Sequence, residues 1–318
     1  MPAEPAHDTS MNMPGIIAAL LSALLMGTIG VFSKITGLPA ETITFFRLML
    51  GAGFMLLFLL VTRQTGCLKQ WPTWPVLING GMLSGFIIFY VQAMNLTTMA
   101  NAIMLVYLAP LTASFYAHFF LGERLNRASI ILIGAALFGF AMMMEFRIDF
   151  STGSNHLAGI CLALIAMFCY AGFILINRVI REDVHVYTRT FYQLLTGALI
   201  MLPFLLLNMP TISTENWFWL FGTGLFPGFL AILCAVIALS RLPAATFGTL
   251  AYFEPIAVIL FGWLIFSETL SPLQIAGCSL ILGSGVVKAW LTAWTQPACP
   301  PAAVTTDTVA EASGPCQS

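Results

Sequence analysis

The stretch Pro243–Leu270, PAATFGTLAYFEPIAVILFGWLIFSETL, indicates the fold class of this chain. It is an apolar run long enough to cross a bilayer, for which about 20 residues suffice. One carboxylate, Glu254, lies near its middle, where a charge in a membrane helix costs about 2.5–3.5 kcal/mol. Because ionisable groups inside a membrane usually serve a function, Glu254 is the first candidate for a site.

This stretch has an earlier copy at 98–125, TMANAIMLVYLAPLTASFYAHFFLGERL. Six identities fall at one offset of 145 residues (255 − 110), without a gap. The pairs are Ala100 and Ala245, Leu105 and Leu250, Tyr107 and Tyr252, Pro110 and Pro255, Glu123 and Glu268, and Leu125 and Leu270. Chance rarely produces such a match, so we interpret the chain as a duplication.

The composition excludes a water-soluble domain. Of the 318 residues, 59% are hydrophobic and only 8% are charged, against about 25% charged in soluble proteins. The mean hydropathy is +0.93. The net charge of −1 and the lack of a basic stripe argue against a nucleic-acid partner.

No enzyme or cofactor motif occurs in the sequence. A Walker A loop, an HExxH helix and a GxSxG elbow are all missing. The seven cysteines are scattered and show neither CxxC nor metal-site spacing. We therefore predict that the protein is not an enzyme, has no catalytic residue, and holds no cofactor and no metal.

Ten segments are apolar and long enough to span a membrane, which predicts an all-α integral membrane protein with ten transmembrane helices. Within a few residues they are 15–36, 40–62, 74–95, 99–121, 126–144, 157–179, 185–208, 215–238, 243–266 and 271–292. Residues 1–14 form a cytoplasmic N-terminal tail and not a signal peptide. Residues 146–156 form a linker, and 293–318 a disordered cytoplasmic C-terminal tail.

The ten helices divide into two five-helix repeats, 15–145 and 157–292. The helix from Gly15 aligns with the helix from Gly159, and Phe46 aligns with Phe191. Since five is odd, the second repeat enters the membrane from the opposite side. An inverted repeat of this kind is typical of secondary transporters.

Positive charge in the connections predicts which side is cytoplasmic. Under an N-terminus-inside topology, the outer connections hold only Lys34 and Arg147. The cytoplasmic connections hold Arg63, Lys69, Arg124, Arg127, Arg178, Arg181, Arg241 and Lys288. The bias places both termini in the cytoplasm.

The chain resembles the EamA family of bacterial metabolite exporters, within the drug/metabolite transporter superfamily. The resemblance rests on Pro110 with GERL (122–125), Glu254–Pro255 with SETL (267–270), Phe46–Arg47 and the glycine-rich fifth and tenth helices. Met26 stands where the family often carries an aromatic residue.

This resemblance implies a transporter of the bacterial inner membrane that exports small organic metabolites, such as amino acids, by alternating access. Its partners would be a small-molecule solute and membrane lipid, and the solute gradient or protons would drive export. The oligomeric state stays open. One alternative is an importer or exchanger of a nucleotide-derived or phosphorylated metabolite, which would require several cations in the cavity. The alternative from another class is a non-transporting membrane protein or a membrane enzyme.

We expect a midplane site between the halves, lined by the first, third, fourth, sixth, eighth and ninth helices. Glu254 could titrate a proton or pair with substrate, or could only satisfy donors freed near Pro255. Pro110 and Pro255 are expected to act as hinges, with helix packing as the alternative.

Further candidates are tyrosines and two basic side chains. Tyr107 and Tyr252 could face a shared cavity or only pack, and Tyr90 and Tyr170 lie near the middle of their helices. His118, on one helical stripe with Tyr107, could relay protons or only be hydrogen-bonded. Arg47 could snorkel outwards or pair with a carboxylate such as Glu41.

Overall fold

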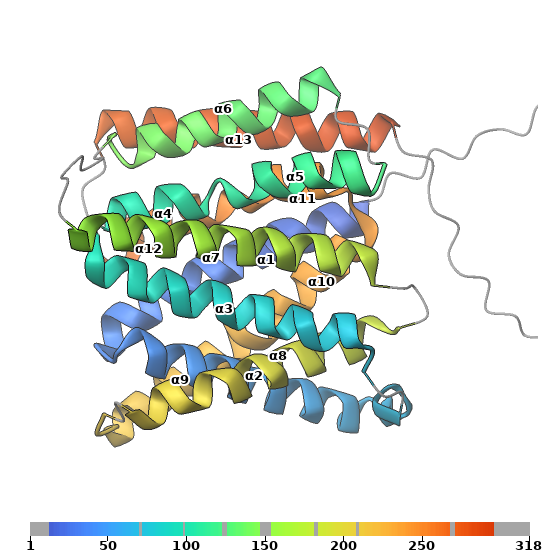
Figure 1. Ribbon diagram of the computed structural model, residues 1–318, viewed down its shortest axis with the longest axis vertical. Coiled ribbons are helices and arrows are strands. Elements are labelled where there is room, and N and C mark those ends of the chain that lie inside the picture. The colour runs from blue at the N-terminus through green and yellow to red at the C-terminus, as the bar shows by residue number, and fades with distance from the viewer. Residues whose placement is uncertain are drawn as a thin grey trace, which may run out of the picture.

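The computed structural model describes residues 13–69, 72–97, 99–122, 126–146, 154–180, 184–207, 210–267 and 271–295. The parts of the predicted tails before residue 13 and after residue 295 lie outside the described residues, as do 147–153 of the linker, Glu123 and Glu268. Within the described part the regular structure is entirely helical (Figure 1).

The helices follow the predicted segments closely. In chain order they are α1 (Met13–Thr36), α2 (Ala40–Val61), the short 3₁₀ helix η1 (Thr65–Lys69), α3 (Trp74–Leu96), α4 (Met99–Val106), α5 (Ala109–Phe120), α6 (Arg127–Met143), α7 (Ser154–Val179), α8 (Val186–Leu207), α9 (Thr214–Thr223), the π-helical η2 (Gly224–Leu230), α10 (Ala231–Arg241), α11 (Ala244–Ala251), α12 (Phe253–Phe266) and α13 (Pro272–Thr295).

Seven helical runs of the described residues are long and apolar enough to cross a membrane, whereas α6 and the part of α13 from Pro272 to Lys288 are shorter apolar stretches. Large apolar side chains are exposed around the bundle, among them Ile131, Leu207 and Phe218 at 69%, 78% and 73%. So much exposed apolar surface is unfavourable in water, whereas the hydrocarbon chains of lipid can cover it. The chain is a multi-pass membrane protein.

Two predicted spans are broken near their prolines. The segment 99–121 is divided into α4 and α5 at Tyr107 and Leu108, and the segment 243–266 is divided into α11 and α12 at Tyr252. A proline has no N–H and its ring clashes with the carbonyl four residues earlier, which interrupts the helix there. We counted one span at each place in the sequence, and the structure divides each of these spans into two helices near the proline where a hinge was expected.

The most extensive contacts join a helix of the first half of the chain to a helix of the second half. α3 packs on α7, and in the corresponding contact α10 packs on α1. α6 packs on α13 and α2 packs on α8, so these pairs each join one helix to its own counterpart. Figure 1 shows the α6–α13 pair along one edge of the bundle and α2 with α8 along the opposite edge. Such reciprocal contacts are those of a two-fold arrangement.

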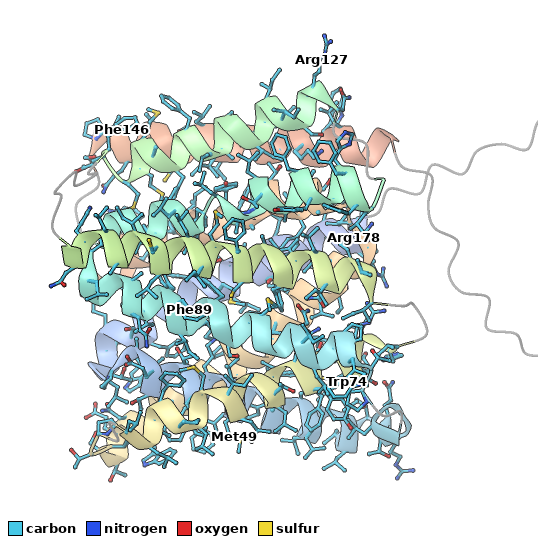
Figure 2. All side chains as sticks on the ribbon, in the orientation of Figure 1. Met49, Trp74, Phe89, Arg127, Phe146 and Arg178 are labelled. Atoms are coloured by element: carbon cyan, nitrogen blue, oxygen red, sulfur yellow. The ribbon has the colours of Figure 1, made fainter. Side chains whose placement is uncertain are left out.

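Corresponding helices run in opposite directions. α7 begins at the end of the bundle where Phe146 lies and finishes at the other end with Arg178 (Figure 2). Nη1 of Arg178 donates to the carbonyl oxygen of Leu239, 3.3 Å away, near the last turn of α10. The start of α1 lies at the same place, because a Cβ on Gly15 would be 3.1 Å from Leu242. We call these two ends the Phe146 end and the Arg178 end.

Candidate functional site

A cavity of about 850 Å³ enters the bundle from the Phe146 end and reaches its middle. Ser33 and Ala40, at the end of α1 and the start of α2, line it together with Glu145 and Ser271. The other polar and aromatic lining residues are Ser22, Thr44, Arg47, Phe86, Tyr90, Tyr107, Phe140, Tyr170, Phe173, Phe247, Glu254 and Gln274. Beyond the helices expected from the sequence, α2, α6 and α13 also contribute.

α5 of the first half packs on α11 of the second half. Gly248 of α11 lies against Pro110 of α5, since a Cβ on this glycine would be 2.7 Å from the proline Cβ. Ala113 and Ala117 of α5 and Leu239 of α10 belong to the main hydrophobic core together with Leu250 of α11. No residue of α5 is among the described residues that line the cavity.

Arg47 supplies a positive charge inside the cavity. Its side chain is only 9% exposed, so it does not snorkel out of the bundle. Nη2 lies 3.5 Å from the sulfur of Met26, and Nε has no hydrogen-bond partner. The charged neighbour with which it interacts is Glu254, not Glu41. A buried guanidinium that still has a free N–H group is ready to bind an anionic oxygen.

Glu254 supplies the opposite charge. It lies in the first turn of α12, lines the cavity, and interacts electrostatically with Arg47. The Tyr107 hydroxyl donates a hydrogen bond to its carboxylate. The roles of Glu254 in transport and in satisfying donors near Pro255 both stay predictions.

Tyr107 and Tyr252 occupy equivalent breaks, but they play different parts. The Tyr252 hydroxyl donates to the backbone carbonyl oxygen of Tyr107 over 2.6 Å, and their rings lie 5.8 Å apart. Tyr252 is fully buried and is not part of the cavity lining, whereas Tyr107 lines the cavity. One tyrosine therefore holds the other, which in turn contacts Glu254.

Tyr90 and Tyr170 line the cavity with a residue that the sequence did not single out, Phe86. The Phe86 ring stacks on Tyr170 at 4.9 Å and 20°, and on Tyr90 at 6.0 Å and 24°. Phe86 precedes Tyr90 by one helical turn of α3. This spacing from Tyr90 was the signal by which the sequence could have indicated Phe86. It was not decisive, because a phenylalanine in an apolar helix faces lipid as readily as a cavity.

The remaining candidates lie at different depths. Pro255 is buried and lines the cavity, whereas Pro110 is buried against Gly248 and is not a lining residue. His118 is exposed in the last turn of α5, with its ring 5.2 Å from Phe119, and is not a lining residue. Among the described residues, no three His, Cys, Asp or Glu side chains form a group that could hold a metal ion.

Known proteins are similar to this chain in sequence and in fold. A profile of the EamA-like transporter family matches residues 13–145 and again 157–287. An uncharacterized transporter of Archaeoglobus fulgidus is 27% identical over 87% of this chain and 96% of its own. The pseudopaline exporter CntI of Pseudomonas aeruginosa is 27% identical over 84% and 93%, and the threonine/homoserine exporter RhtA of Escherichia coli 25% identical over 86% and 90%.

A solved crystal structure superimposes with a TM-score of 0.79 at 23% identity, over 87% of this chain and 96% of that one, which supports the fold alone. The relatives carry the names of transporters and not of enzymes. The two profile matches account for most of the sequence. The chain therefore belongs to the EamA-like transporter family.

Proposed function

We propose that this protein is a secondary transporter of the bacterial inner membrane that exports amino acids and related zwitterions. The observation that carries the proposal is one cation and one anion, Arg47 and Glu254, in the wall of a single buried cavity. A zwitterion presents the complementary pair of charges. Export as the direction is supported by the printed names of two relatives.

Each head group has a suitable partner. The guanidinium of Arg47 can take the α-carboxylate, because its planar N–H groups match the geometry of a carboxylate. Glu254 takes the α-ammonium group, and the hydrogen bond from Tyr107 fixes its carboxylate in place. Coulomb attraction is stronger in a cavity enclosed by apolar side chains than in water. Protein and substrate neutralise each other, which offsets the cost of burying either charge alone.

The transport cycle follows from the arrangement of the repeats. We propose ten spanning helices in two inverted repeats, 15–145 and 157–292, with both termini in the cytoplasm. The two profile matches and the opposite directions of α1 and α7 support this topology. The Phe146 end is then outside, and the cavity is in its outward-open state. Alternating access requires α5 and α11 to part, with the breaks near Pro110 and Pro255 as hinges.

Transport by purified protein in lipid vesicles tests the proposal. Vesicles loaded with labelled amino acids should release them faster than empty-lipid controls. The same side chain carried on a carboxylic acid without the amine, or on an amine without the carboxylate, should compete poorly. A protein that moves no zwitterion from a broad panel would contradict the proposal.

The alternative, transport of a phosphorylated or nucleotide-derived metabolite, is less favoured. Among the described residues that line the cavity, Arg47 is the one lysine or arginine side chain. A phosphate group usually requires several cationic or N–H donors. Competition by a nucleotide or sugar phosphate at concentrations where amino acids fail would favour this alternative.

A further inference from the structure

Three aromatic rings stand together in the lining of the cavity. Tyr90, Phe86 and Tyr170 form a wall of three nearly parallel rings, with centroids 6.0 Å and 4.9 Å apart along the stack. We call this set the ring wall. Two of its rings come from α3 and the third from α7, so it bridges the two repeats.

The ring wall lies next to the proposed head-group site. The carboxylate of Glu254 is close enough to both Tyr90 and Tyr170 for electrostatic interaction. All of these side chains line the same cavity as Arg47. A zwitterion held by its head group would therefore place its side chain within reach of the rings.

The hydroxyls of Tyr90, Tyr170 and Thr44 are the polar groups on offer besides the head-group site, but the ring faces present mainly apolar surface. Ser22 also lines the cavity, but its hydroxyl already donates to the carbonyl oxygen of Ala231 over 2.9 Å. Other polar lining residues, such as Ser33, Glu145 and Ser271, lie at the mouth. A threonine-sized substrate would leave the rings in contact with water, whereas a large apolar side chain would cover them.

We propose that the ring wall selects amino acids and related zwitterions with a large planar or apolar side chain over small hydroxylated ones. This inference rests on the proposed function. An aromatic substrate would extend the stack in an offset or edge-to-face arrangement, which aromatic pairs prefer. One methylene group in an apolar pocket changes selectivity by about ten-fold or more, so the preference for phenylalanine over threonine should exceed ten-fold.

The experiment compares two phenylalanines on one helix. Phe86 lines the cavity, and Phe89, labelled on α3 in Figure 2, is not part of the lining. Wild-type protein, Phe86→Leu and Phe89→Leu are reconstituted in vesicles. Transport of labelled phenylalanine, tryptophan, leucine, threonine and homoserine is then measured for each protein.

Wild-type protein should carry phenylalanine and tryptophan at least ten-fold more efficiently than threonine and homoserine. Phe86→Leu should reduce that ratio several-fold, and Phe89→Leu should keep it. If Phe86→Leu does not fold, Tyr170→Leu from α7 provides the same comparison. Equal or better transport of threonine would overturn the inference and leave the proposed function standing. Transport of none of the five would count against the proposed function itself.

Discussion

Removal of the Tyr252 hydroxyl tests the contact that joins the two helix breaks. The hydroxyl donates over 2.6 Å to the Tyr107 carbonyl, which lies between α4 and α5 where the helix is interrupted. In Tyr252→Phe this carbonyl loses its partner at a site that is fully buried. Hydrogen bonds between membrane helices contribute about 0.6–1.7 kcal/mol. An unsatisfied buried group raises the loss, and we expect about 1–2 kcal/mol.

Thermal unfolding in detergent, followed by size-exclusion chromatography, measures this loss. Tyr252→Phe should unfold at a clearly lower temperature than wild type. The matched control is Tyr116→Phe, on the exposed surface of α5, which should change stability by less than about 0.5 kcal/mol. Tyr107→Phe should instead reduce transport more than stability, because it releases Glu254. Wild-type stability of Tyr252→Phe would refute the reasoning.

Three further predictions concern packing, coupling and topology. Gly139→Ala should destabilise the α6–α13 pair by about 1–3 kcal/mol, because the new Cβ would lie 2.8 Å from the Gly277 carbonyl oxygen. The control is Gly134→Ala on the same helix, whose Cβ would meet nothing within 4 Å and which should be neutral or stabilising. Equal melting temperatures of the two variants would contradict this prediction. If Glu254 couples transport to protons as well as binding the ammonium group, Glu254→Gln should exchange substrate between vesicles at equal concentration at a reduced rate but fail to accumulate it under a pH difference, and full accumulation would exclude coupling. Reporter fusions after Arg63 and after Phe146 should give cytoplasmic and external signals respectively, and the same signal at both would disprove the inverted topology.

The helices and the duplication could be predicted from the sequence, because both depend on local features. Long apolar runs define the helices, and the 145-residue register of Tyr107 with Tyr252 marks the repeat. Arg47 and Glu254 stood out because charges are rare in apolar runs. The sequence could not show that they share one cavity, since that depends on how α2 and α12 pack.

The sequence could not show where a helix is interrupted or changes its type. The stripe from Tyr107 to His118 assumed a continuous helix, but the structure interrupts the helix at Tyr107 and Leu108. Tyr107 therefore lines the cavity while His118 is exposed. The π-helical segment around Pro227 was also not predicted, since no periodicity distinguishes it within an apolar run.

The central claim is that Arg47 and Glu254 bind the two head groups of a zwitterion. The most direct test measures how well each substrate analogue competes in each variant. Vesicles containing wild type, Arg47→Gln or Glu254→Gln exchange the labelled amino acid that wild type carries fastest. Its deaminated acid and its decarboxylated amine serve as competitors. Wild type should reject both at least ten-fold. Arg47→Gln should lose discrimination against the amine only, and Glu254→Gln against the acid only. Unchanged discrimination in both variants would contradict the account.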